Sequence, residues 1–236
     1  MIERQPDAPG GARRTVRSFV RRAGRLTPGQ RRALALYWPK YGIDRDPEQR
    51  LDPVQLFGRR APCVLEIGFG SGATLLAAAA AQPERDFLGI EVHEPGLGRL
   101  LAGLESERLS NVRVLREDAA DLLARGIAPG SLAEVWLYFP DPWPKFRHHK
   151  RRLVQPPFVE QVHTALQRGG RLCLATDWEP YAEQMLDVGD ACAGLRNIAG
   201  AGHYLDRPKH RATTKFERRG ERRGHRVRDL IYERID

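Results

Sequence analysis

Short apolar segments alternate with helical segments along the chain, about one pair every 25 residues, and this alternation limits the possible folds. The apolar segments have the length of buried strands and lie at 63–68, 86–92, 111–115, 132–139, 170–177 and 227–235. The helical segments lie at 71–82, 95–108, 118–125, 157–167 and 179–193. Strands joined by helices form right-handed crossovers and a mostly parallel sheet. The pattern therefore predicts an α/β protein with a Rossmann-like, doubly wound sheet.

The first 60 residues do not share this pattern. Residues 1–24 lack apolar periodicity, so we expect a flexible basic arm. Thr27 followed by Pro28 is typical of a helix start, and the helix should end before Pro39, which lacks a backbone N–H. The predicted organisation is an arm at 1–24, a helix and turn-rich segment at 25–60, and one α/β domain at 61–236.

Charge is unevenly distributed along the 236 residues, whose formal net charge is +9. Residues 1–60 carry +8, residues 61–202 carry −4 and residues 203–236 carry +5. Within the acidic middle, the stretch 145–152 (KFRHHKRR) holds five basic residues, two histidines and no acid. Clustered Lys and Arg favour a polyanionic partner, because they release counterions from phosphates. A solvated surface in an arginine-rich protein is the alternative.

Composition disfavours several classes of protein. No apolar run approaches the roughly 18 residues that a membrane span needs, and the N-terminus lacks the apolar core of a secretory signal. Cys63, Cys173 and Cys192 are widely separated and form no CxxC pair, so we expect neither a disulfide framework nor a metal site. Unpaired thiols fit a reducing cytoplasm. The sequence is compatible with a monomer or a homodimer.

The first expected strand ends in a glycine-rich turn that also carries an acid. Glu66 is followed by Gly68, Gly70 and Gly72, where the next helix begins. Ligands of open α/β sheets bind at this edge, and glycines let a cofactor approach the backbone. The pattern also satisfies a dinucleotide fingerprint, in which helix amides hold a pyrophosphate. The acid at 66 and the glycine at 72 favour S-adenosylmethionine (AdoMet), whose amino-acid end is cationic.

Two further acids follow the second and third expected strands. Glu91 closes its strand, and its two carboxylate oxygens can accept hydrogen bonds from both hydroxyls of a ribose. This role fits NAD and AdoMet equally. Asp118 follows the third strand, where it can accept a hydrogen bond from an adenine amino group or cap the next helix.

The segment after the fourth expected strand, 138–152 (YFPDPWPKFRHHKRR), is the most distinctive in the chain. Three prolines restrain the backbone around Asp141, which holds its carboxylate in place at low entropic cost. Trp143 and Phe146 can pack or stack, and the basic stretch follows at once. A rigid acid beside phosphate-binding cations suits a nucleotide base presented by a charged polymer. The structural alternative is a proline-rich surface loop with solvated charges.

Two later segments add candidate substrate contacts. Asp177 ends the fifth expected strand at the same sheet edge, where it can bond a substrate base or cap a helix. The TTKFE stretch at 213–217 lies in the basic C-terminal segment, and its TxxE pattern is also that of a capping box.

The 138–152 segment, the ExGxGxG turn upstream and TKFE downstream together resemble the bacterial tRNA (guanine-N(7)-)-methyltransferases, a family of class I AdoMet-dependent enzymes. The match runs from about residue 17 to the end of the chain. The resemblance implies transfer of a methyl group from AdoMet to N7 of a guanosine in the tRNA variable loop. It implies tRNA as the partner and requires no metal.

The resemblance also implies roles for individual residues. The implied cofactor contacts are Glu66, Gly68, Gly70, Gly72, Glu91, Asp118 and Asp141, with Asp141 as the catalytic-site acid. The implied substrate contacts are Lys145, Asp177, Thr214, Lys215, Phe216 and Glu217. The implied RNA contacts are Arg147, His148, His149, Lys150, Arg151 and Arg152.

Other functions share part of this pattern. A nucleotide-linked dehydrogenase would need the glycines and Glu91 but not the basic stretch. A class I methyltransferase acting on another RNA or on a protein would keep every feature except the tRNA target. A non-catalytic RNA-binding protein on a methyltransferase scaffold would lose the cofactor acids, which are present here.

Overall fold

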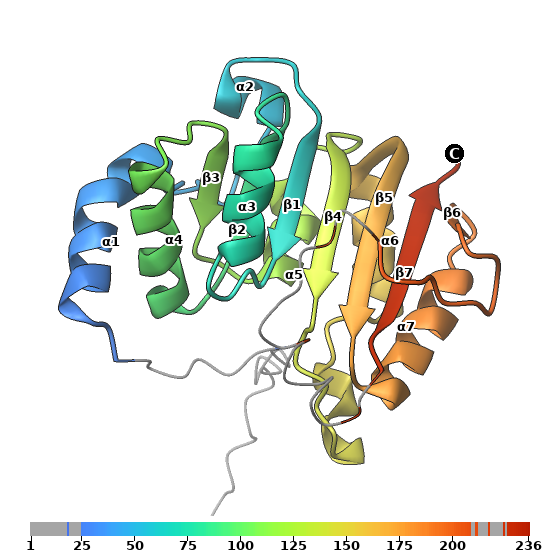
Figure 1. Cartoon of the computed structure of the whole chain (residues 1–236). Helices are drawn as coiled ribbons and strands as arrows, with labels where there is room; N and C mark the ends of the chain where they lie inside the picture. Colours follow the sequence, from blue (N-terminus) through green and yellow to red (C-terminus); the bar gives the residue numbers. More distant parts are fainter. Residues whose placement is uncertain (1–17, 19–24, 209–210, 212–216, 218–223, 225) are drawn as a thin grey trace, which may run out of the picture.

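The computed structural model describes residue 18, residues 25–208, residues 211, 217 and 224, and residues 226–236. These residues form one doubly wound sheet with helices on both faces, which confirms the predicted α/β fold (Figure 1). Of the predicted arm at 1–24, only Ser18 is described, so that prediction lies outside the described residues.

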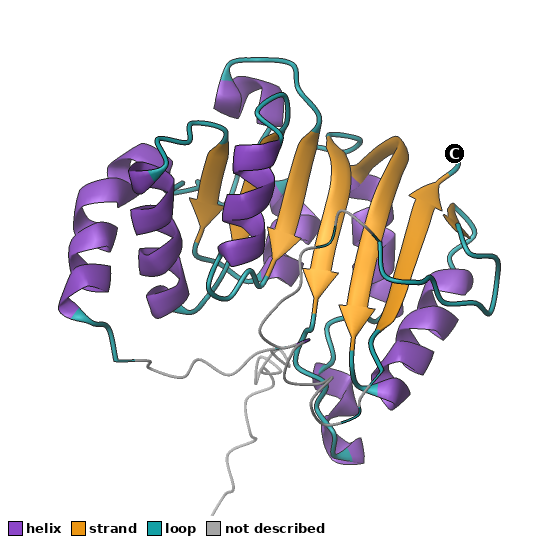
Figure 2. Cartoon of the chain, viewed as in Figure 1, coloured by secondary structure: helices purple, strands orange, loops and turns teal. Residues whose placement is uncertain are grey.

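Seven strands form the sheet in the order β3-β2-β1-β4-β5-β7-β6. Their bounds are β1 Cys63–Ile67, β2 Asp86–Ile90, β3 Val112–Leu115, β4 Leu132–Tyr138, β5 Leu166–Thr176, β6 Leu195–Asn197 and β7 Arg228–Arg234. Strands β1 to β5 run parallel, whereas β7 is antiparallel to both β5 and β6. Because Arg228 pairs with Thr176, the start of β7 lies at the edge where β5 ends. The loops that follow β1 to β5 and the loop that precedes β7 therefore meet at one edge (Figure 2).

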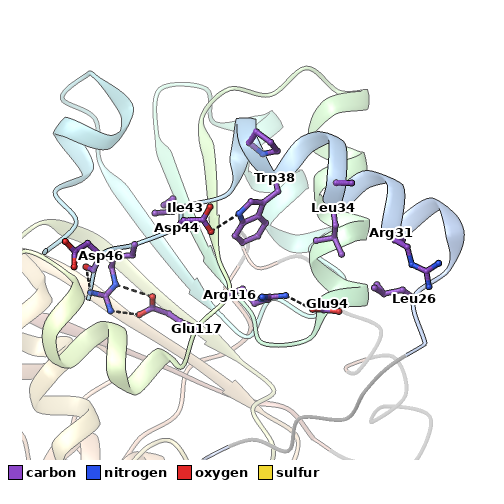
Figure 3. A pocket seen from close by; sticks show the side chains of 13 residues that line it. Leu26, Arg31, Leu34, Trp38, Ile43, Asp44, Asp46, Glu94, Arg116 and Glu117 are labelled. Carbon is purple, nitrogen blue, oxygen red and sulfur yellow. Dashed lines mark hydrogen bonds and ion pairs between the residues drawn. The ribbon is translucent and has the colours of Figure 1, made fainter. Parts of the chain in front are cut away.

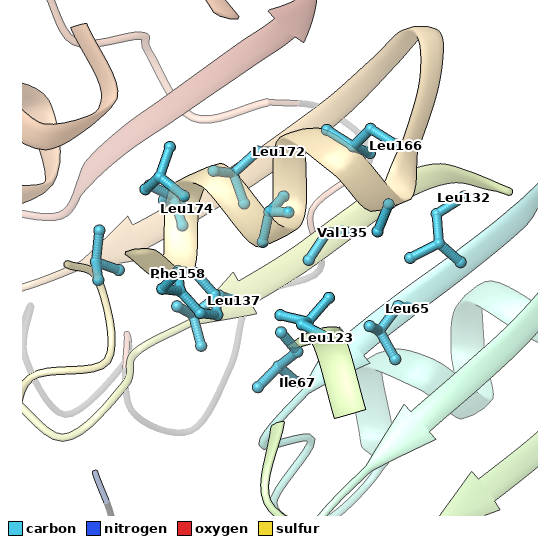
Figure 4. Packing of buried hydrophobic residues seen from close by; sticks show 14 of the residues in the cluster. Leu65, Ile67, Leu123, Leu132, Val135, Leu137, Phe158, Leu166, Leu172 and Leu174 are labelled. Carbon is cyan, nitrogen blue, oxygen red and sulfur yellow. The ribbon is translucent and has the colours of Figure 1, made fainter. Parts of the chain in front are cut away.

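The helices cover the sheet in two layers. Their bounds are α1 Pro28–Tyr41, α2 Pro53–Phe57, α3 Ala73–Ala81, α4 Glu94–Ser106, α5 Ala119–Asp121, η1 Leu122–Gly126, η2 Phe146–Arg151, α6 Pro156–Ala165 and α7 Glu179–Asp190. One apolar cluster joins α1, α3 and α4 to the sheet. The other joins η1, α6 and α7 to the opposite face (Figure 4). Strand β1 is buried along its whole length because it contributes side chains to both clusters.

The N-terminal helix was predicted to end before Pro39, and this prediction is wrong because α1 continues to Tyr41. The start is as predicted: Thr27 caps the helix and exchanges hydrogen bonds with Gln30. Pro39 lies in the last turn, where its missing N–H loses only one hydrogen bond. Tyr41 is fully buried, and its hydroxyl donates to Glu105 at 2.9 Å, which holds this turn in place.

Other differences concern short elements and element ends. Residues 166 and 167 were predicted to end a helix, but they begin β5 because Leu166 pairs with Leu132. Helix α2 lies in the segment described as turn-rich, and the three-residue β6 was not predicted. Asp52, Pro53 and Gly58 supply the cap, first-turn proline and left-handed end of α2, so its signals were present in the sequence.

Candidate active site

The turn after β1 folds as its glycines require. Gly68, Gly70 and Gly72 have φ values of 68°, 57° and 74°, a left-handed region that favours glycine. A Cβ atom on Gly72 would lie 2.7 Å from Leu100, so this glycine also lets α3 and α4 pack together. The turn leaves β1 and enters α3 with its backbone open to a ligand.

Gly96, in the first turn of α4, was not singled out from the sequence. A Cβ atom at this position would lie 2.0 Å from the carbonyl oxygen of Gly70, so only a glycine allows α4 to approach the turn. The sequence signal is weak, since Gly96 stands in a helix beside a second glycine, Gly98. Gly96 therefore sets how closely α4 packs against the glycine turn after β1, although it lies outside the ExGxGxG motif.

Glu91 joins the turn to the end of β2. Its carboxylate accepts hydrogen bonds from the N–H groups of Gly70, Val92 and His93 at 2.8–3.0 Å. These bonds hold both oxygens at the edge of the sheet, which suits an acceptor for two ribose hydroxyls.

A cavity of about 310 Å³ lies at this edge, beyond the ends of β1, β2 and β4. It is lined by Ser18, Ile67, Gly68, Gly70, Ile90, Glu91, Val92, His93, Glu117, Asp118, Ala119, Leu137, Tyr138, Phe139, Pro140, Asp141 and Leu153. Five predicted cofactor residues are among these, whereas Glu66 and Gly72 are not. Asp118 also caps α5 by accepting from the N–H of Ala120 at 3.0 Å, so the structure shows the capping role and places the same carboxylate at the cavity.

Glu66 precedes the cavity-lining Ile67 at the end of β1 and is only 4% exposed. Its Oε2 atom has no hydrogen-bond partner among the described residues. Burial, together with the nearby charge of Glu91, raises the pKa of Glu66 to about 8. A buried carboxyl oxygen without a partner is costly, so it indicates a site for a hydrogen-bond donor or a cation that the protein itself does not supply.

The proline loop after β4 brings Asp141 to the opening of the cavity. Phe139 and Trp143, on either side of it, have φ values of 53° and 45°, which are unusual for residues other than glycine. The Trp143 indole N–H donates to the carbonyl of Ser18 at 3.0 Å. Asp141 itself is exposed, and it is the only one of the five cavity-lining cofactor residues contributed by this loop.

Arg152 differs from the other predicted RNA contacts because its side chain is buried. It is 3% exposed, and its guanidinium donates to the carbonyls of Pro142 and Pro180 and to Oε1 of Gln184. These bonds fasten the proline loop to α7. The structure thus shows Arg152 as an anchor of the loop, and its predicted contact with RNA stays a prediction.

The remaining basic residues lie on η2 or directly before it, beyond the carboxyl ends of β4 and β5 (Figure 1). Three are exposed: Lys145, Arg147 and Lys150. Three are half-buried: His148, His149 and Arg151. Partial burial and the surrounding cations lower the pKa of His148.

The predicted substrate contacts near the C-terminus are placed only in part. Asp177 is half-buried at the end of β5 and does not line the cavity. Thr214, Lys215 and Phe216 lie outside the described residues. Glu217 is 1% exposed and forms an ion pair with Arg211 at 2.8 Å. In the structure, therefore, Glu217 is held by Arg211.

Arg211 was missed from the sequence, although its contacts connect three parts of the site. Its guanidinium donates two hydrogen bonds to Glu217 and two to Asp229 on β7, at 2.6–3.0 Å. It also lies over the rings of Tyr138 and Phe139, with its central carbon 5.9 and 5.6 Å from the ring centres. The side chain is 1% exposed. Arg211 thus joins the C-terminal segment to the start of the proline loop.

A larger cavity, of about 950 Å³, lies between α1 and the segment after β3 (Figure 3). Four of its charged side chains pair with each other: Arg45 with Glu117, and Arg116 with Glu94. Trp38 donates its indole N–H to Asp44 at 3.0 Å. Among the described residues, Glu117 alone lines both this cavity and the smaller one.

The sheet order, the antiparallel β7 and the cofactor turn define the fold of class I methyltransferases. Solved structures with this fold include 16S rRNA methyltransferase KamB, with a TM-score of 0.54 and 17% identity over 77% of this chain and 92% of that one. TrmN from Thermus thermophilus has a TM-score of 0.53 and 20% identity over 78% of this chain and 47% of that one. At this level of identity the likeness concerns the fold alone.

The family is established by closer similarity. A family model described as "Putative methyltransferase" matches residues 60–230, and the chain belongs to this methyltransferase family. Proteins named tRNA (guanine-N(7)-)-methyltransferase are 55% identical in Stutzerimonas stutzeri, over 99% of this chain and 97% of that protein, and 57% identical in Alkalilimnicola ehrlichii, over 98% and 97%. The protein of that name from Escherichia coli is 53% identical over 100% of this chain and 98% of its own length.

Two properties of the described residues bear on other classes of protein. No described helix has the length and apolar character needed to cross a membrane. The described part of the chain also contains no group of three or more His, Cys, Asp or Glu side chains that could hold a metal ion.

Proposed function

We propose that the protein transfers a methyl group from AdoMet to N7 of a guanosine in the variable loop of tRNA. One observation carries the proposal most strongly: Glu91, Asp118 and Asp141 line one cavity at the sheet edge, and the unpartnered carboxyl of Glu66 lies near enough to Glu91 for the charge of Glu91 to raise its pKa. The relatives with that activity in their names are 53–57% identical over nearly the whole chain.

The residues at the cavity fit AdoMet better than a dinucleotide. A pyrophosphate would be repelled by the carboxylate of Glu91 and would leave the oxygen of Glu66 without a donor, whereas the α-ammonium group of AdoMet would satisfy that oxygen. Glu91 is held where it can accept from ribose hydroxyls, and Asp118 where it can accept from the adenine amino group. When bound, AdoMet supplies a methyl group on a positively charged sulfur.

The reaction does not require the protein to act as an acid or a base at N7. Guanine N7 carries a free lone pair, so no proton has to leave it before it attacks the methyl carbon. Methylation makes the purine ring cationic, and a carboxylate near the base then stabilises the transition state more than the ground state. The role proposed for Asp141 is to accept hydrogen bonds from the guanine N1–H and amino groups, not to act as a base. Orientation of the two substrates supplies much of the remaining rate.

The substrate side of the site lies on η2 and around Asp177. Lys145, Arg147 and Lys150 are exposed next to the loop that carries Asp141, so phosphates bound there would bring a nucleotide to the cavity. Asp177 follows the neighbouring strand β5, and the role proposed for it is a hydrogen bond to the base. Cytoplasmic location is part of the proposal, and it is supported by the three free thiols of Cys63, Cys173 and Cys192. Either a monomer or a homodimer could carry this site, since every residue named belongs to one chain.

Incubation with methyl-labelled AdoMet and unmodified tRNA tests the proposal. The digested tRNA should contain labelled 7-methylguanosine, and fragment analysis should place it in the variable loop. Label in another nucleoside, or methylation of ribosomal RNA but not of tRNA, would replace the proposal with the alternative of a methyltransferase acting on a different site or RNA.

A further inference from the structure

We propose that Phe146 is a stacking platform for an unpaired base of the RNA substrate. The inference rests on the proposed function, because it takes RNA to be the molecule bound along η2. It concerns a residue to which neither the family resemblance nor the comparisons assign a role.

The exposure of Phe146 is the first observation. Its side chain is 88% exposed, compared with 54% for Leu36, the next most exposed large apolar residue among those described. Burying an aromatic side chain of this size is favourable, so a ring left in water either is incidental or is buried by a partner.

Trp143, three residues earlier, shows how the same loop treats an aromatic that it needs for itself. The guanidinium of Arg151 lies over the Trp143 ring at 3.8 Å, and His148 packs against it edge-on at 5.9 Å. Its indole N–H bonds to Ser18. The loop thus uses one aromatic ring internally and presents the other to solvent.

The surroundings of Phe146 identify the kind of partner. Its chain neighbours Lys145 and Arg147 and the nearby Lys150 are exposed cations, and the stretch 145–152 contains no acid. The other exposed large apolar residues of the described chain, Leu36, Val54, Ile198 and Ile235, lie on different elements. A single aromatic ring among cations suits a base whose phosphates contact the cations, whereas an apolar protein partner would require an apolar patch.

The ring is also partly oriented before any partner binds. His149 packs against it on η2 with 5.4 Å between the ring centres and 62° between the planes. This contact restricts rotation of Phe146, so less conformational entropy is lost when a base stacks on it.

Stacking and phosphate binding can be separated by their dependence on salt. The experiment measures tRNA affinity of Phe146→Ala, Phe146→Leu and Phe146→Trp over a range of salt concentrations, with Leu36→Ala on α1 as the matched exposed control. Phe146→Ala and Phe146→Leu should weaken binding roughly 5- to 150-fold, and Phe146→Trp should retain it. The slope of log K against log salt should stay at the wild-type value in all of them, because every phosphate-binding cation remains in place. The AdoMet affinity of every variant should match wild type. The tRNA affinity of Leu36→Ala should also match wild type.

Three results would overturn the inference. Phe146→Ala could bind tRNA as wild type does, Phe146→Leu could retain full affinity, or Phe146→Ala could change the sedimentation of the protein without RNA, which would assign the ring to a protein interface. Wild-type methylation of tRNA is measured in the same preparations. Loss of the wild-type reaction would contradict the proposed function, whereas an intact reaction with an indifferent Phe146→Ala contradicts only the stacking inference.

Discussion

Glu66 combines a buried carboxyl, an unpartnered oxygen and a pKa of about 8 against an ordinary value of 4.5. Without ligand, folding favours its protonated form, so its effect on stability worsens as the pH rises from about 4.5 through 8. If the ammonium of AdoMet lies beside it, the ionised form is favoured in the complex. Binding should then release a proton at neutral pH.

Calorimetry in buffers of different ionisation enthalpy measures this proton release. For wild type, AdoMet affinity should rise with pH up to about 8, where Glu66 ionises without help from the ligand. Glu66→Gln is the matched control, because it keeps the shape and leaves only the titration of AdoMet itself. Equal proton release by wild type and Glu66→Gln would contradict the placement of the AdoMet ammonium group beside Glu66.

Asp141 is tested by the rate of the methyl-transfer step. Asp141→Asn keeps the size of the side chain and the backbone restraint of Pro140 and Pro142, but it removes the charge that offsets the developing purine cation. Single-turnover methylation should fall roughly 10²- to 10³-fold, while AdoMet affinity changes little. The wild-type rate should not vary with pH around neutrality, whereas a required base that titrates there would give a sloping limb. A near-normal rate in the Asn variant would leave Asp177 as the acid that holds the base.

On the scale of elements, η2 and the residue after it carry two kinds of cation. Arg147 and Lys150 face solvent, whereas Arg152 holds the proline loop. The double variant Arg147→Ala and Lys150→Ala should weaken tRNA binding and reduce the slope of log K against log salt by about 0.7–0.9 for each phosphate that is no longer bound. Its thermal stability should match wild type, since both side chains are exposed. An unchanged slope would make this face a solvated surface.

Arg152→Ala should behave in the opposite way. It leaves the carbonyls of Pro142 and Pro180 without their donor, so the free energy of unfolding should fall by about 1–3 kcal/mol. Chemical denaturation measures this loss, and the slope of log K against log salt for tRNA binding should stay close to wild type. A full-stability Arg152→Ala protein with a reduced slope would restore Arg152 to the RNA contacts.

The Arg211 contacts make a prediction for the C-terminal segment. Arg211→Met would remove the cation that hydrogen-bonds both buried acids, Glu217 and Asp229, at a cost of about 3–5 kcal/mol, although Arg207 would still lie 3.7 Å from Glu217. Tight tRNA binding should be lost with the attachment of this segment, whereas Arg211→Lys should retain part of both. Arg234→Met, which removes hydrogen bonds to the carbonyls of His163 and Leu166 at the other end of β7, is the control. Equal loss of tRNA affinity in both variants would reduce Arg211 to a general stabilising residue.

The sequence was sufficient for elements with a clear period. Five parallel strands, their helices and the final strand could be predicted because each contributes apolar side chains to one or both of two clusters. Strand β6 has only three residues, too few to show a period, and it exists because Asn197 pairs with Tyr232 of β7. Pro39 favoured an early end of α1, but burial of Tyr41 outweighed this local preference.

The site shows the same limit for single side chains. Gly68, Gly70, Glu91, Asp118 and Asp141 could be placed at one edge because each follows a strand of a parallel sheet. Arg152 and Arg211 could not be distinguished from the other arginines, because their roles depend on partners 28 residues away in one case and 18 in the other. In an arginine-rich sequence, the arginines that form bonds within the protein cannot be distinguished from those that face solvent.

On the scale of the whole molecule, the fold brings the acids and the cations of the proposed reaction to one edge of the sheet (Figure 1). The cavity acids come from loops after β2, β3 and β4, and η2 lies next to them on the loop from β4. Strand β7 runs against its neighbours, which places Asp229, and through it Arg211 and Glu217, at the same edge. The rest of the sheet and both helical layers hold this edge in place.

Transfer to guanine N7 is the central claim, and replacement of that single atom tests it most directly. The measurement is single-turnover methylation of two tRNA transcripts, one with guanosine and one with 7-deazaguanosine at the methylated position, where a carbon replaces N7. The guanosine transcript should be methylated, whereas the 7-deaza transcript should bind with similar affinity and receive no methyl group, because it lacks the attacking lone pair. Methylation of the 7-deaza transcript at that nucleoside would contradict the account, since the methyl group would then be going to another atom.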